Sequence, residues 1–192
     1  ADGADTVLEW RRSTTDEFQP RLRLAGVSVA ELTHANFISG FDPAGGTAEL
    51  TLTGTDGANV LDGMSFDDEL YGLSGSDTIH GNAGDDYIEG GDEAGLGDVL
   101  FGDAGNDVIS GGNGSDTISG GSGDDALDGG AGDDVLDGGS GNDVLEGGAG
   151  ADVLVDRSGA NRLLGGEGND TIKRESGEEG NTELGDVDDT GR

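Results

Sequence analysis

The chain has 192 residues, of which 41 are glycine and none is cysteine, and 42 acids against nine Lys and Arg give a formal net charge of −33. This charge excludes nucleic acid and anionic membrane surfaces as partners and favours cations, while the lack of cysteine excludes disulfides and thiolate metal sites. With 31% hydrophobic and 4% aromatic residues, the chain cannot build the shared core of an ordinary globular domain. No apolar run reaches the roughly 20 residues that span a bilayer.

Residues 1–53 have the composition of a small conventional cap, with four of the nine basic residues. Apolar and polar residues alternate over residues 21–24 and 48–52, which predicts strands with one buried face. The capping-box spacing from Ser28 to Glu31 predicts a short helix from Val29 to about Asn36. Residues 3–7 are similar to the last half of the repeat that begins at Gly54. We therefore expect the chain to be a segment of a longer protein.

A nine-residue repeat, G-G-x-G-x-D-x-aliphatic-x, occupies residues 54–173 in thirteen consecutive units. The eighth position is always Leu or Ile, and the sixth is Asp except at Asn59 and Asn161. The unit that starts at Gly90 is three residues too long, which predicts a small loop around residues 93–95 before the register resumes at Asp98. Residues 174–192 are polar and acidic, and we expect a loose tail there.

The spacing of glycine and aspartate in each unit predicts a calcium site. Glycines at positions one, two and four let the backbone turn its carbonyl oxygens toward one point, and the Asp at position six adds a carboxylate. A short strand follows, so two units close one coil, and a cation can lie between turns two units apart, as with Asp107 and Asp125. A ligand set made only of oxygens selects Ca²⁺.

We predict that several calcium ions bind, with sixth-position carboxylates and first-position glycines as the ligands. The predicted residues are Asp68, Asp77, Asp86, Asp98, Asp107, Asp116, Asp125, Asp134, Asp143, Asp152, Asp170, Gly102, Gly111, Gly120, Gly129, Gly138 and Gly147. The acids at positions five and nine, such as Asp124, Asp128 and Asp137, are interpreted as surface charge.

No Lys or Arg occurs from Gly54 to Val155, so the stacked carboxylates have no internal counter-charge and repel one another without metal. One buried aliphatic residue per unit returns about 1.5 to 3 kcal/mol, whereas ordering each residue costs roughly 1 to 2 kcal/mol. We therefore expect calcium to drive folding, with an expanded chain in its absence.

The repeat units resemble the nonapeptide of the RTX (repeats-in-toxin, hemolysin-type) calcium-binding family. The resemblance covers about residues 54–173 and implies an all-β fold, a right-handed parallel β-roll with two strands per coil, preceded here by the small β-rich cap with one helix. It also implies export by bacterial type I machinery and folding outside the cell, where calcium is abundant. Departures at Asn59, Phe66, Asp156-Arg157 and Asn161 put the sites near both ends in doubt.

The function expected from these features is that of a non-enzymatic calcium-binding module in a larger secreted or cell-surface bacterial protein. Neither histidine has a spaced partner, and nothing resembles a nucleophile elbow or an ordered triad. Two alternatives stay open. One is a calcium-rigidified assembly module of an adhesin, surface layer or filament, with self-association or neighbouring domains as partners. The other is an accessory module of an exported protease, lipase or alginate epimerase.

Overall fold

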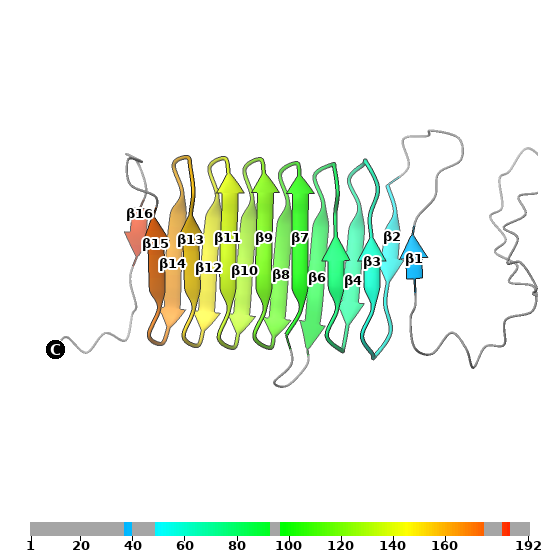
Figure 1. The fold of residues 1–192 in the computed structure, drawn as a ribbon, viewed down its shortest axis with the longest axis horizontal. Helices are drawn as coiled ribbons and strands as arrows, with labels where there is room; N and C mark the ends of the chain where they lie inside the picture. The colour runs from blue at the N-terminus through cyan, green and yellow to red at the C-terminus, as the bar shows by residue number, and fades with distance from the viewer. Residues whose placement is uncertain (1–36, 40–48, 93–96, 175–181, 185–192) are drawn as a thin grey trace, which may run out of the picture. The chain divides into compact units, whose positions relative to one another are not determined.

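The computed structural model describes residues 37–39, 49–92, 97–174 and 182–184. Within these residues every element is a strand, and the strands form two eight-stranded parallel sheets around one core (Figure 1). The chain alternates between the sheets, so one sheet holds the odd-numbered strands and the other the even-numbered strands. The predicted parallel β-solenoid with two strands per coil is therefore confirmed.

The strands are short and succeed one another at the repeat interval. The odd sheet contains β1 (Phe37–Ser39), β3 (Val60–Asp62), β5 (Thr78–His80), β7 (Val99–Ala104), β9 (Thr117–Ser122), β11 (Val135–Ser140), β13 (Val153–Asp156) and β15 (Thr171–Arg174). The even sheet contains β2 (Thr51–Thr53), β4 (Glu69–Leu73), β6 (Tyr87–Asp92), β8 (Val108–Asn113), β10 (Ala126–Ala131), β12 (Val144–Ala149), β14 (Arg162–Glu167) and β16 (Thr182–Leu184).

Equivalent repeat positions lie side by side in neighbouring coils. Leu136 pairs with Ile118 on one side and Leu154 on the other, each 18 residues away, which is the length of two units. Across the long unit the offset is 21 residues, since Ile79 pairs with Leu100. The register thus resumes at Asp98, as the sequence predicts, and the surplus residues change no pairing of the strands.

The core is one aliphatic side chain per unit. Strand residues at position eight point inward and are 0–3% exposed from Leu61 to Leu163, whereas those at positions seven and nine point outward. This period-two alternation follows from the pleat of a strand. The core is therefore a thin internal stack rather than a three-dimensional hydrophobic interior.

The turns between strands depend on left-handed backbone at two repeat positions. Position four is glycine in most units, as at Gly132 (φ 144°), and position two has the same sign of φ, as at Gly130 (φ 98°). In three N-terminal units position two is instead Leu73, Asn82 or Asp103, with φ of 71–79°. Residues other than glycine rarely adopt a positive φ, because their Cβ then conflicts with the backbone. These three turns therefore carry backbone strain that the Gly-Gly turns avoid.

The described residues from Phe37 onward belong to one unit, and the sheets extend beyond the repeat array. Strands β1 and β2 precede Gly54 and pair with β3 and β4, while β16, in the segment where we expected a loose tail, pairs with β14. The predicted helix from Val29 to about Asn36 and the predicted strand at 21–24 lie outside the described residues. In the described part of the chain, no helix has the length and apolarity to cross a bilayer.

Candidate metal centre

The sixth-position side chains form two columns, one along each turn edge of the solenoid. Successive turns lie on opposite edges because each unit supplies one strand and one turn, so side chains 18 residues apart stack on the same edge. One column holds Asn59, Asp77, Asp98, Asp116, Asp134, Asp152 and Asp170; the other holds Asp68, Asp86, Asp107, Asp125, Asp143 and Asn161. The structure thus gathers the predicted carboxylates into two files.

In each file, the Oδ1 atoms of the aspartates link neighbouring coils. The Asp116 N–H donates to Oδ1 of Asp134 at 2.7 Å, and the Asp134 N–H donates to Oδ1 of Asp152 at 2.8 Å. The other edge is built in the same way, with the Asp107 N–H donating to Oδ1 of Asp125 at 2.9 Å. Each Oδ1 therefore accepts the backbone N–H of the equivalent residue one coil earlier, and we call these chains of hydrogen bonds the position-six ladders.

The second oxygen, Oδ2, is buried and accepts no hydrogen bond from the protein in nine of these aspartates. They are Asp77, Asp86, Asp98, Asp107, Asp116, Asp125, Asp134, Asp152 and Asp170. Leaving a buried acceptor without a partner costs about 1 to 3 kcal/mol, and more if it is charged. Each of these nine oxygens therefore needs either a proton or a cation beside it.

Backbone carbonyls lie beside these Oδ2 atoms. A Cβ placed on Gly129 would be 2.5 Å from Oδ2 of Asp134 and 2.6 Å from the carbonyl oxygen of Gly147. First-position glycine is required here, because any side chain would occupy the space that the two oxygens share. The same relation recurs at Gly102, Gly111 and Gly120, whose would-be Cβ atoms lie 2.6–2.8 Å from the carbonyl oxygen of the first-position glycine two units later.

The electrostatics of the ladders favour the neutral carboxyl group when only the protein surrounds it. Burial raises the pKa of Asp125 and Asp134 to about 7, and that of Asp77, Asp86 and Asp107 to about 6. The backbone hydrogen bond to each carboxylate opposes this rise, and neighbouring carboxylates add to it. A bound cation has the opposite effect and stabilises the ionised form.

The donor set fits calcium. Within the described residues no three His, Asp or Glu side chains meet at one point, so an ion in the ladders takes its ligands from few carboxylates and from backbone carbonyls. Oxygen ligands of both kinds at flexible geometry are the ligands of Ca²⁺. The structure brings the predicted aspartates and first-position glycines together, and their role as ligands stays a prediction.

The two asparagines that replace aspartate at position six accept different hydrogen bonds. Asn161 continues its ladder without charge, since its Oδ1 accepts the Asp143 N–H at 2.6 Å. The Oδ1 of Asn59 instead accepts the Thr55 N–H of its own turn at 2.6 Å. Amide oxygens can therefore replace the hydrogen-bonding role of the aspartate, but not its charge.

A second ladder lies at position five, where the sequence pattern predicts only surface charge. Asp124 is exposed, yet its Oδ1 accepts the Asn142 N–H at 2.7 Å. Equivalent bonds join Asp85 to Asp67, Asn106 to Asp85, Asp124 to Asn106 and Ala160 to Asn142. The signal was present in the sequence, because position five is Asp or Asn in five successive units on this edge.

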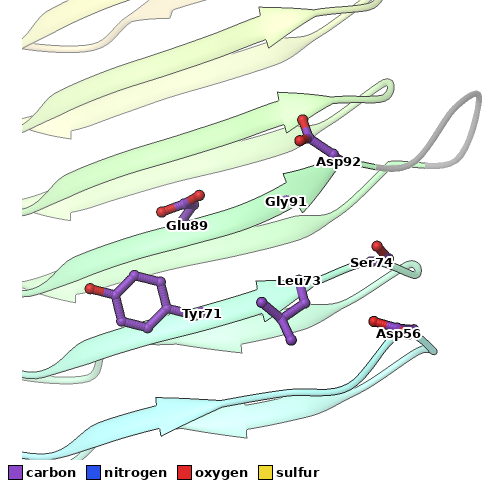
Figure 2. Close-up of a pocket in the computed structure, with 7 residues that line it drawn as sticks. All are labelled: Asp56, Tyr71, Leu73, Ser74, Glu89, Gly91 and Asp92. Atoms are coloured by element: carbon purple, nitrogen blue, oxygen red, sulfur yellow. The ribbon is translucent and has the colours of Figure 1, made fainter.

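A surface cavity of about 280 Å³ lies on the even sheet, away from the ladders (Figure 2). Its lining includes the Tyr71 ring, Leu73 and the carboxylates of Asp56, Glu89 and Asp92. These carboxylates are exposed, so they lack the desolvation that marks the position-six aspartates. The cavity is therefore not part of the candidate metal centre.

Comparison with known families agrees with the geometry of the ladders. A model of the RTX calcium-binding nonapeptide repeat, which contains four copies of the unit, matches residues 62–96, 94–127, 111–145, 119–154 and 146–181. These overlapping matches cover residues 62–181 without a gap, which is more than half of the chain. The comparison with curated proteins found no match.

Proposed function

The chain belongs to the RTX calcium-binding nonapeptide repeat family, and from this premise we propose that it is a non-catalytic folding module of a larger secreted bacterial protein. In this proposal the module stays unfolded in the calcium-poor cytoplasm and folds into the β-roll outside the cell. The observation that carries the proposal is the pair of position-six ladders, in which nine aspartates have a buried Oδ2 that accepts no hydrogen bond from the protein.

The chain's own residues make the folded state depend on an external cation. From Gly54 to Val155 there is no Lys or Arg, so no side chain in this range can neutralise the ladders. Stacked carboxylates in a low-dielectric interior repel strongly, and the single file of buried aliphatic residues is too thin to offset this. Bound calcium supplies the positive charge that the ladders lack.

The ligands that we propose are Oδ2 of the position-six aspartates and the carbonyl oxygens of the first-position glycines. The Oδ1 atoms are already engaged by backbone N–H groups, which hold each carboxylate in a fixed orientation. Each unit with an aspartate at position six therefore presents an oriented carboxylate, and binding at one turn also orders the turn of the next coil. This coupling predicts cooperative folding as calcium rises.

Circular dichroism through a calcium titration of the 192-residue chain tests the proposal. We expect a spectrum of an unordered chain in EDTA and a cooperative gain of β-structure with added CaCl₂. The same concentrations of MgCl₂ serve as the control, because Mg²⁺ demands near-ideal octahedral geometry and dehydrates reluctantly. A spectrum in EDTA identical to that in calcium would reject the proposal.

A calcium-rigidified assembly module is the second candidate, favoured by exposed apolar residues on both sheets, such as Val108 and Val135. Light scattering in calcium separates the two functions. Open-ended growth into large particles supports assembly, whereas a small particle of fixed mass supports the folding module.

A further inference from the structure

The two outer faces of the β-roll differ in charge. On the even sheet, the outward positions seven and nine carry Glu69, Glu89, Asp128 and Glu146 against one base, Arg162. On the odd sheet, the same positions from β3 to β15 carry two acids and one lysine: Asp62, Asp137 and Lys173. In a chain of net charge −33, the odd sheet is therefore a face of low charge.

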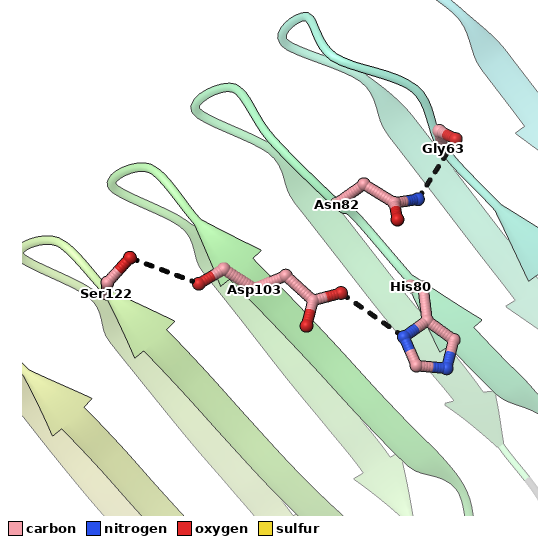
Figure 3. Close-up of polar contacts among 5 residues, drawn as sticks. All are labelled: Gly63, His80, Asn82, Asp103 and Ser122. Carbon is pink, nitrogen blue, oxygen red and sulfur yellow. Dashed lines mark hydrogen bonds and ion pairs between the residues drawn. The ribbon is translucent and has the colours of Figure 1, made fainter.

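Two acids on this face already have basic partners. Asp103 Oδ2 lies 3.2 Å from Nδ1 of His80 (Figure 3). The His80 ring stacks on Phe101 with centroids 4.4 Å apart. The Arg157 guanidinium donates to both oxygens of Asp137 at 2.7 and 2.9 Å. Both contacts lie on the odd sheet, and that of Arg157 with Asp137 is an ion pair.

The rest of the face is flat and lightly apolar. Position seven is β-branched in every coil, and position three of the turns that follow these strands is always Ser or Ala. The position-seven column is Val60, Thr78, Val99, Thr117, Val135, Val153 and Thr171, and the position-three column is Ser65, Ala83, Ala104, Ser122, Ser140 and Ser158. Even-sheet turns carry Asp56, Asp92 and Glu167 at position three.

The order of residues along the face is self-complementary. A two-fold axis along β9 places β7 of one copy over β11 of the other, so that Val99 meets Val135. The same axis places β3 over β15, which brings Asp62 of one copy opposite Lys173 of the other. A two-fold axis along the roll would instead place β3 over β3 and β15 over β15, so that neither Asp62 nor Lys173 would have an opposite charge across the interface.

We propose that the odd sheet is a self-association face, on which a second copy of this chain docks in antiparallel orientation. The docked copy keeps its acidic even sheet away from that of its partner, which limits the repulsion between two highly charged molecules. Antiparallel pairing about one two-fold axis also closes the assembly at two copies. The proposal requires that the β-roll is folded, and does not depend on secretion or on the parent protein.

The size of the face sets the expected affinity. Six strand spacings of about 4.8 Å and a width of about five residues give a face on the order of 500 Å² per copy, below the roughly 800 Å² of a standard interface. We therefore expect a weak dimer, with a Kd in the range of about 10 to 100 μM.

Sedimentation velocity in calcium, over a concentration series across this range, tests which face associates. We expect Val135→Glu, at the centre of the odd sheet, to weaken the dimer at least about tenfold. Val144→Glu is the matched control, because Val144 has the same repeat position and similar exposure (38% against 40%) but lies on the even sheet. Circular dichroism of the same samples separates lost association from lost folding.

Charge exchange tests the orientation. Asp62→Lys and Lys173→Asp should each weaken the dimer, since each creates two like-charge contacts, and the double exchange should restore it. A wild-type chain that is folded but monomeric throughout the concentration series would overturn the proposal, as would a dimer sensitive to Val144→Glu and not to Val135→Glu. Failure of the double exchange to restore association would overturn the antiparallel arrangement.

Discussion

At the residue scale, a position-six aspartate such as Asp134 has two separate tasks. Its Oδ1 is a structural acceptor for a backbone N–H, while its Oδ2 is buried and accepts no hydrogen bond from the protein. An asparagine can perform the first task, as Asn161 does, but it cannot supply the anionic oxygen. The two tasks can therefore be separated by an isosteric substitution.

Asp134→Asn should raise the calcium concentration at the midpoint of folding at least about twofold, because one site loses its anionic ligand. The same change should make the calcium-free chain easier to fold, since it removes a buried charge. Calcium titrations followed by circular dichroism measure both effects. Asp133→Asn is the control: Asp133 precedes Asp134, is exposed, and accepts a backbone hydrogen bond that asparagine preserves. Equal shifts in the two variants would contradict the assignment.

The raised pKa values predict how the calcium-free chain responds to pH. Unfolded aspartate titrates near 3.8, while in the roll burial raises the pKa of Asp125 and Asp134 to about 7. Between these values the roll binds more protons than the unfolded chain, so its stability is highest at low pH and is lost as pH rises through about 7. Circular dichroism in EDTA should show more β-structure at about pH 5 than at about pH 7.5.

Calcium should reverse this order, because protons then compete with the metal for the same oxygens. A calcium-free chain that is better folded at the higher pH would contradict the predicted direction. The lower pH of this experiment is about 5, because closer to the isoelectric point near 4.1 the chain loses the net charge that keeps it soluble.

At the scale of the element, one nonapeptide is a turn, a short strand and one buried aliphatic side chain. Leu145 in β12 is 1% exposed, whereas its neighbour Val144 is 38% exposed. Leu145→Ala should destabilise the calcium-loaded roll by about 2 to 5 kcal/mol, because the thin core cannot close the cavity. Val144→Ala should change the stability by less than about 1 kcal/mol. Thermal unfolding in saturating calcium measures both, and comparable losses would contradict the one-residue core.

The elements inside the array could be predicted from sequence because the units repeat one pattern of glycine, aspartate and aliphatic residues. Position eight is inward and position six is at the turn from Gly54 to Ile172, and the extra residues after Asp92 leave the pairing intact. Strand β16 could not be predicted, since Thr182–Leu184 has no glycine pattern and pairs only because β14 presents an unsatisfied edge. The position-five ladder was missed because exposed acids are usually solvated, and its hydrogen bonds depend on the register between coils.

At the scale of the whole molecule, the β-roll combines strongly anionic edges with a nearly neutral odd sheet. Neither the length nor the composition indicates this asymmetry, because it appears only when alternate units are assigned to different sheets. The same assignment explains why Val135 and Val144, one unit apart in sequence, lie on different faces.

The position-six ladders also have a direction along the chain. In every rung the N–H belongs to the earlier coil and the accepting oxygen to the later one, from Leu50 with Asp68 to Asp152 with Asp170. Within these two ladders, trimming from the N-terminal side thus leaves free acceptors, whereas trimming from the C-terminal side leaves a buried donor without its acceptor. Asp170 and Asn161, which accept the last N–H of each ladder, therefore do for the solenoid what a capping residue does at the end of a helix.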